Sequence, residues 1–245
     1  MSPARHDGRV SDPTTNYASR TAKRDGRTRM TGKERREQLL DIGRSLFAQK
    51  GFDATSVEEI ALNAGVSKPV VYEHFGGKEG LYAVVVDREM SKLLAAITGA
   101  LTSTGSPRQL LERAAFALLD YVDSNADGFR ILVRDSPVAS STGTFASMIS
   151  DIASQVEHLL SREFEQRGFD ATFAPMYSQM LVGMVALTGQ WWLDVRSPAK
   201  EEVAAQLVNL SWNGLSGLEA HPALLTTKAQ QVARGQRERG ADGDR

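Results

Sequence analysis

A short run of residues after a tight turn has the side chains needed to read DNA. Ser67 and Lys68 carry hydrogen-bond donors, and the neighbouring Pro69 and Val70 can pack against a thymine methyl group. They follow the turn at residues 64–67, where a glycine can adopt a positive φ between two helices. In a helix–turn–helix the second helix enters the major groove. The pattern therefore predicts that these four side chains face base edges.

Four more residues around the same turn could hold the DNA backbone. Tyr72 and His74 lie farther along the second helix, where donors meet phosphate more readily than bases. Thr55 and Lys78 lie at helix amino termini, which favour phosphate. Three of them also have a structural interpretation: Tyr72 as half-buried packing, His74 as surface or core filler, and Lys78 as a solvated charge. Their joint placement around one turn favours contacts that position the DNA-binding unit without reading sequence.

Helical patterns supply the elements that would position these side chains. A T-x-x-E capping box opens the first helix at Thr31, and the second helix is capped at Thr55 or Ser56 and stops at Gly65. No segment suggests a strand, and no repeat of 20–50 residues suggests a solenoid. We therefore expect an all-α fold of about nine helices. Besides the second, the expected helices are 31–50, 68–75, 78–103, 107–125, 127–134, 144–167, 173–196 and 198–219.

Charge is divided unevenly along the chain. The formal net charge is −1, but residues 1–36 hold ten basic and four acidic residues, which leaves −7 for the rest. We expect four parts: a disordered basic arm (1–30), a helix–turn–helix DNA-binding domain (31–77), a second helical domain (78–225) and a disordered tail (226–245). The arm could lie along the duplex or in its minor groove, although a flexible solubilising tail is an equal alternative.

Several classes of function have no support in the sequence. The chain has no cysteine, and its four histidines are too widely spaced for a metal cluster. A phosphate loop, an H-E-x-x-H motif and a G-x-S-x-G elbow are also absent, so we expect no enzyme, no metal and no cofactor. The first thirty residues lack a signal-peptide core, and no apolar stretch reaches the roughly 20 residues of a membrane span. We therefore expect a cytoplasmic protein with no membrane partner.

The helix expected at 173–196 is apolar nearly all round. A helix of this kind must be buried on every side, so one stripe would face its own domain and the other a partner subunit. The stripes are Met176, Met180, Met184, Leu187 and Trp191, and Tyr177, Leu181, Val185, Thr188 and Trp192. Apolar positions between Val203 and Leu215 in the last helix support the same pairing.

Flexible methionines and flat aromatic rings in this second domain suit an adaptable apolar ligand. Stripes of this kind also form ordinary core, and that alternative stays open. The candidate ligand-binding residues are Phe116, Leu119, Met148, Ile152, Tyr177, Met184 and Trp191.

The run from Arg36 to Leu81 resembles the amino-terminal domain of the TetR family of bacterial transcriptional regulators. The matching signatures are Leu-Phe…Gly at the end of the first helix, Thr-Ser before the second, Ile-Ala…Ala-Gly-Val-Ser at the turn and Tyr-x-His-Phe…Lys-x-x-Leu after it. Gly43 stands where the family usually has alanine, and we expect it to loosen the packing slightly. By position, the family's DNA contacts correspond to Thr55, Ser67, Lys68, Pro69, Val70, Tyr72, His74 and Lys78.

The resemblance implies a homodimer that binds a palindromic double-stranded DNA operator and is modulated by a small apolar effector. It also implies that residues 78–225 form the helical ligand-binding and dimerisation domain. Regulators of this family are usually repressors, and an activator of the same fold is the alternative. The segment from Gly189 to Leu215 is similar to members that control fatty-acid metabolism, so an acyl chain or acyl-coenzyme A is a candidate effector. An all-α lipid carrier or enzyme is the alternative from another class; a carrier would need the apolar cavity without the basic amino-terminal unit.

Overall fold

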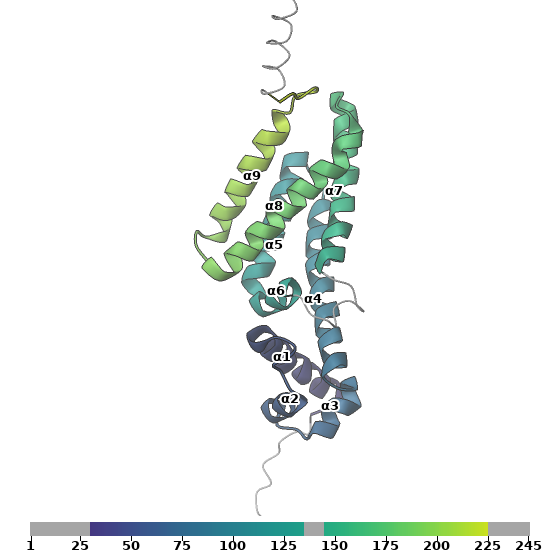
Figure 1. The fold of residues 1–245 in the computed structure, drawn as a ribbon, viewed down its shortest axis with the longest axis vertical. Coiled ribbons are helices and arrows are strands. Elements are labelled where there is room, and N and C mark those ends of the chain that lie inside the picture. The colour runs from purple at the N-terminus through teal and green to yellow at the C-terminus, as the bar shows by residue number, and fades with distance from the viewer. Residues whose placement is uncertain (1–29, 135–144, 225–245) are drawn as a thin grey trace, which may run out of the picture.

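The computed structural model describes residues 30–134 and 145–224. Over these ranges the chain is all-α, as predicted, with nine α-helices, one 3₁₀ helix and no strand (Figure 1). The expected basic arm and carboxy-terminal tail lie almost wholly outside the described residues. The elements are α1 (Gly32–Lys50), α2 (Val57–Ala64), α3 (Lys68–Phe75), α4 (Lys78–Leu101), α5 (Pro107–Ser124), α6 (Ala126–Val133), α7 (Phe145–Arg167), η2 (Ala171–Phe173), α8 (Ala174–Val195) and α9 (Lys200–Ser216).

Capping side chains explain where α1, α2 and α5 begin. The Thr31 hydroxyl accepts from the Glu34 amide at 3.2 Å, and the Glu34 carboxylate accepts from the Thr31 amide at 2.7 Å, which completes the predicted capping box. Ser56 caps α2, because its hydroxyl accepts from the Glu59 amide at 3.1 Å. Gly65 ends α2 in the left-handed conformation, with φ of 63°.

Several expected boundaries differ from the structure by one to three residues, and two of these differences have a local reason. Helix α4 ends at Leu101 rather than Ser103, because the Thr102 and Ser103 hydroxyls donate back to the carbonyls of Thr98 and Ala100. Helix α9 begins at Lys200 rather than at residue 198, because Ala199 is extended and serves as its cap.

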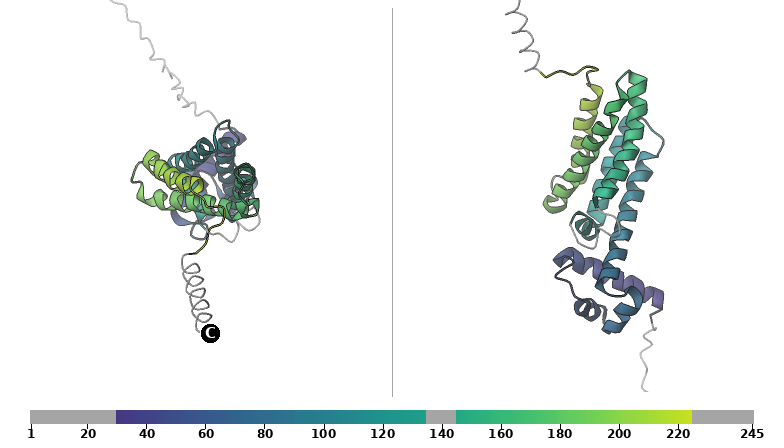
Figure 2. Two further views of the ribbon diagram at one scale, coloured as in Figure 1. Left: turned by 90° about the horizontal axis from the view of Figure 1, so that it is seen from above. Right: turned by 45° about the vertical axis from the view of Figure 1, so that its right-hand side comes forward.

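The helices form two packed groups that α4 connects. Helices α1, α2 and α3 gather at one end, and α4 runs from them into a bundle with α5, α7, α8 and α9 (Figures 1 and 2). Helix α6 packs on α1 and α4 at the junction between the groups. One continuous apolar cluster runs from Leu39 to Val208 through both groups. The border expected between residues 77 and 78 falls at the start of α4.

Gly43 tightens the packing of α1 on α4, so the expectation of looser packing was wrong. The buried side chain of Leu81 fills the space that a larger residue would need. A Cβ atom at position 43 would lie 2.8 Å from Leu81 Cδ2, closer than real Cβ contacts. The missing side chain therefore leaves room for the Leu81 side chain of α4 against α1.

Within the described part of the chain, no helix is long and apolar enough to cross a membrane.

Candidate nucleic-acid interface and ligand cavity

The start of α3 presents most of the predicted DNA-reading residues to solvent. Ser67, Lys68 and Pro69 are exposed, and Val70 is half-buried against the core. One turn later Tyr72 is 54% exposed, so about half of its side chain is accessible while the ring packs beside Gly77. Val71 is fully buried and fixes the opposite face of the helix. The structure thus places these residues together on one accessible edge.

Lys68, the residue best suited to hydrogen-bond a base, has an intramolecular partner. Its ammonium donates to the Glu58 carboxylate on α2. This hydrogen bond holds the pKa of the Glu58 carboxyl below its usual value. Both side chains are more than half exposed, so the pair is weak and DNA can compete for the lysine.

Thr55 has a structural role that excludes the phosphate contact expected of its hydroxyl. The residue is 2% exposed, and its hydroxyl donates to the Gly51 carbonyl at 2.7 Å. Ser56 is the side chain at the α2 amino terminus, and the T-S pair in the sequence did not show which residue would take that position. The Thr55 hydroxyl therefore closes the α1–α2 turn instead of facing DNA.

His74 near the end of α3 and Lys78 at the start of α4 are half-buried. Both residues make contacts that hold the helices of the DNA-binding domain together. The Lys78 ammonium donates to the Phe52 carbonyl at 3.0 Å and lies 4.2 Å above the Phe52 ring. The His74 carbonyl accepts from the Arg36 guanidinium at 2.9 Å, which ties α1 to α3. A phosphate contact by Lys78 would have to replace or share its bond to Phe52.

An apolar cavity of about 440 Å³ lies between α4, α5, α7 and α8, with α9 at one end. This volume is in the range of small-molecule sites. Two of the predicted ligand residues, Met148 and Ile152, line it. The α4 residues Leu93, Ile97 and Leu101 also line it, and sequence reasoning missed them although their four-residue spacing marks one helix face.

The other five predicted ligand residues lie outside this cavity. Leu119 is fully buried, but successive residues turn by about 100°, so it faces away from the α5 surface where Leu118 meets the cavity. Tyr177 packs edge-on against Phe164 at 5.4 Å. The remaining three are partly exposed at the surface or packed beside the cavity: Phe116, Met184 and Trp191.

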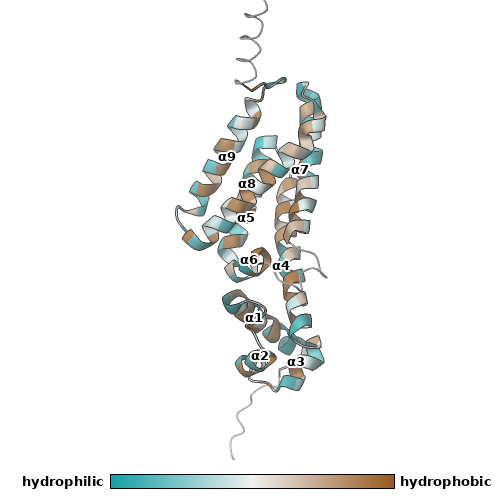
Figure 3. Cartoon of the chain, in the orientation of Figure 1, coloured by the Kyte–Doolittle hydropathy of each residue, from teal (hydrophilic) through white to brown (hydrophobic). Residues whose placement is uncertain are grey.

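The two apolar stripes of α8 have different surroundings. Leu181 and Trp192 of one stripe are buried in their own subunit. Most of the other stripe is exposed, and Leu187 is 65% exposed. Leu210 of α9 is exposed as well, and Figure 3 shows apolar residues recurring along both helices. The exposed set is Met176, Met180, Leu187, Trp191 and Val195 of α8 with Leu210 of α9, called here the α8–α9 face.

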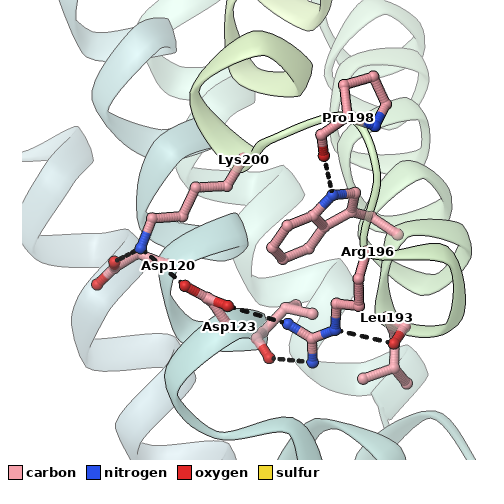
Figure 4. Close-up of polar contacts among 8 residues, drawn as sticks. Asp120, Asp123, Leu193, Arg196, Pro198 and Lys200 are labelled. Carbon is pink, nitrogen blue, oxygen red and sulfur yellow. Dashed lines mark hydrogen bonds and ion pairs between the residues drawn. The ribbon is translucent and has the colours of Figure 1, made fainter.

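Charged contacts hold the α8–α9 turn to α5 (Figure 4). The Arg196 guanidinium donates to Asp123, and the Lys200 ammonium donates to Asp120 at 2.8 Å and Asp123 at 3.0 Å. The two carboxylates raise the pKa of Lys200 above its usual value. The Trp192 indole also donates to the Pro198 carbonyl at 2.8 Å. These contacts orient the α8–α9 face relative to the cavity wall.

A buried polar contact lies where the two groups of helices meet. Glu89 of α4 is 2% exposed, and its carboxylate accepts from the Tyr121 hydroxyl of α5 at 2.7 Å and from Lys92 at 2.8 Å. Gly128 of α6 packs directly on it, since a Cβ there would lie 2.1 Å from Glu89 Oε2. Nearby, Arg88 forms a bidentate pair with Glu37 of α1. Four helices are thus joined at this point.

An exposed recognition helix, carried by a helical domain with an internal apolar cavity, defines a DNA-binding transcriptional regulator. Family models agree in both halves: residues 39–85 match "Bacterial regulatory proteins, tetR family", and residues 107–214 match "Tetracyclin repressor-like, C-terminal domain". The chain belongs to the TetR family of bacterial transcriptional regulators.

Curated relatives and solved structures are consistent with this family. The chain is 32% identical to the HTH-type transcriptional activator FasR of Mycolicibacterium smegmatis, over 77% of this chain and 86% of that protein. A TetR-like regulator from Rhodococcus sp. RHA1 has a TM-score of 0.65 and 27% identity, over 76% of this chain and 97% of its own. The fatty acid degradation regulator FadR from Bacillus halodurans shares the fold, with a TM-score of 0.61 and 16% identity over 74% and 96% of the chains.

Proposed function

We propose that this protein binds a palindromic operator as a homodimer and that a small apolar effector controls this binding. The observation that carries the proposal is the exposed start of α3, where Ser67, Lys68 and Pro69 are accessible. In the proposed complex these residues and Val70 read base edges, while Tyr72 and His74 position the unit on phosphates. Lys78 joins the phosphate contacts through its ammonium group.

A binding experiment tests the DNA-reading role. The full-length protein first selects fragments from a random duplex library, and anisotropy isotherms at two salt concentrations then compare the selected fragment with a scrambled one. Lys68→Ala should reduce the preference for the selected fragment, whereas Tyr72→Ala should weaken binding to both fragments alike. Equal affinity of the wild type for both fragments would refute sequence-specific recognition.

The basic arm is proposed to add affinity without choosing sequence. Removing residues 1–30 should lower affinity and flatten the salt dependence, because fewer counterions are released on binding. An unchanged salt slope would mean that the arm does not contact DNA.

The proposed partner in dimerisation is a second copy of this chain, joined through the α8–α9 face. Exposed apolar patches of this kind mark interaction sites, and Leu187 lies near the middle of the stripe. Leu187→Glu should give monomers in light scattering after size exclusion. Leu62→Glu, which alters an exposed leucine on α2, is the matched control and should leave the dimer intact.

The proposed effector occupies the apolar cavity between α4, α5, α7 and α8. The apolar walls of this cavity favour an acyl chain or acyl-coenzyme A. Mass spectrometry of small molecules released from the purified protein tests this directly. Release of a chain-like lipid would support the proposal. An added acyl-coenzyme A series that neither raises the melting temperature nor changes DNA affinity would refute it.

Two directions of regulation are compatible with the same DNA-bound dimer. Repression is the commoner mode suggested by the family resemblance, whereas activation is favoured by the 32% identical relative, which is named an activator. Transcription of a reporter behind the selected operator separates them. Deleting the regulator should raise expression if it represses and lower expression if it activates.

A further inference from the structure

The cavity is accessible at one end and closed at the other. Its lining residues Gly105, Pro107 and Arg162 are exposed. At the opposite end Leu93 and Met148 are each 1% exposed. Phe145, the first residue of α7, also lines this end and packs edge-on against Phe129 of α6. Helix directions agree, because α4 rises toward the accessible end while α7 begins at the closed end (Figure 1). Among the described residues, the cavity is therefore blind at the end nearer α6.

Polarity follows the same direction. The charged and amide side chains of the lining, Arg162, Glu163, Gln166 and Arg167, all come from the last turns of α7. The Arg167 guanidinium also donates to the Leu215 carbonyl at 3.2 Å, which places α9 beside this end. Toward the closed end the lining side chains are apolar. A ligand that satisfies both ends has a polar head at the α7 carboxyl terminus and an apolar tail directed inward.

The distance between the two ends limits the tail. Met148 lies sixteen residues before Phe164 along α7, so the apolar part between these two residues is about 24 Å long at 1.5 Å per residue. Carbon–carbon bonds of about 1.5 Å at tetrahedral angles advance an extended chain by about 1.25 Å per carbon. The stretch between Met148 and Phe164 therefore holds a straight chain of up to about 19 carbons.

We propose that Met148 forms the floor of the cavity together with Phe145, and that the length of the Met148 side chain sets the longest chain that the cavity accepts. This inference rests on the proposed effector class and identifies the residue that determines its specificity. Met148 is unbranched and buried, and Leu93 of α4 and Leu118 of α5 close the same end. Its three atoms beyond Cβ occupy the space that two or three more carbons of a ligand would need.

Ala186 of α8 provides an opposing change at the same end of the cavity. It lines the cavity one turn before Gly189, and a Cβ at Gly189 would lie 3.0 Å from Leu118 Cδ2. Ala186 therefore lies close to the level of Leu118. A larger side chain at position 186 should shorten the cavity, whereas a smaller one at position 148 should lengthen it.

Thermal-shift and calorimetric titrations of the full-length protein test the proposal. The probes are saturated fatty acids and their coenzyme A thioesters in steps of two carbons, from octanoyl to tetracosanoyl. Met148→Ala should move the best-bound chain to one longer by at least one step, and Ala186→Leu should move it to a shorter one. Met184→Ala is the matched control, because Met184 packs beside the cavity without lining it, and the optimum should stay unchanged.

The outcomes separate this inference from the proposed function. If no probe binds the wild type, both the acyl-chain effector and the length limit are refuted. If the wild type binds with an optimum that Met148→Ala and Ala186→Leu leave unchanged, the effector class stands and the floor role of Met148 is wrong. Equal shifts in Met148→Ala and Met184→Ala would also overturn it, because they would reflect general loosening of the core.

Discussion

Removing one hydroxyl at the junction of the two helical groups should destabilise the whole protein. Tyr121 donates to the Glu89 carboxylate at 2.7 Å, and both residues are buried. In Tyr121→Phe the ring keeps its edge contact with Phe129, whose centroid is 6.4 Å away, so the change removes mainly the hydrogen bond. Glu89 Oε2 then loses its tyrosine partner, although Lys92 still donates to Oε1.

The magnitude follows from the charge and burial of the acceptor. A hydrogen bond to a charged group contributes about 1.5–3 kcal/mol, and an unsatisfied buried acceptor bears its desolvation cost. We therefore expect Tyr121→Phe to lower the free energy of unfolding by about 2 kcal/mol. For a chain of this size that corresponds to a melting temperature lower by roughly 4–8 °C.

Urea unfolding at equal protein concentration measures this loss, since any dimer makes stability depend on concentration. Tyr177→Phe is the matched control, because the Tyr177 hydroxyl makes no hydrogen bond within the described ranges while its ring packs on Phe164. A Glu89→Met background should remove most of the effect of Tyr121→Phe. The reasoning is refuted if Tyr121→Phe costs no more than Tyr177→Phe, or if its cost is unchanged in Glu89→Met.

Three further outcomes follow, two from the contacts of Glu89 and one from the Lys68–Glu58 pair. Burial, and after it the hydrogen bond to Glu89, raises the pKa of Tyr121. Above about pH 10 the unfolded chain therefore loses the Tyr121 proton while the folded chain keeps it. The free energy of unfolding of the wild type, measured in urea, should then fall relative to that of Tyr121→Phe by up to about 1.4 kcal/mol per pH unit. Parallel pH profiles would contradict this. Gly128→Ala should cost about 2 kcal/mol or more in urea unfolding, because its Cβ would displace the Glu89 carboxylate, and less in a Glu89→Ala background. Glu58→Gln should tighten binding to the selected DNA a few-fold by freeing Lys68, with Glu73→Gln on α3 as control; no change in anisotropy titrations would mean that the ion pair does not compete with DNA.

The sequence predicted the helix–turn–helix well because its signals are local. The Thr31 capping box and Gly65 fix helix ends through contacts within a few residues, and both take the expected conformation. The choice between Thr55 and Ser56 as cap was left open. It depends on the Gly51 carbonyl, which draws the Thr55 hydroxyl into the core.

The cavity was harder to predict because its lining depends on which helix faces meet. Met148 and Ile152 were identified, but an apolar residue on a helix is equally suited to core, cavity or subunit contact. Trp191 and Met184 belong to the same predicted stripe, yet one is exposed and the other packs inside. No pattern within α8 distinguishes these environments.

The sequence by itself determined the fold class, the place of the recognition helix and the family, because caps, turn glycines and helical periodicity act over a few residues. Only the tertiary structure decided that Leu81 fills the space beside Gly43, that Lys68 pairs with Glu58 and that Met148 lines a cavity with residues of α4, α5 and α8. Each of these contacts joins different helices. Their geometry is fixed by how the helices pack, which no single segment encodes.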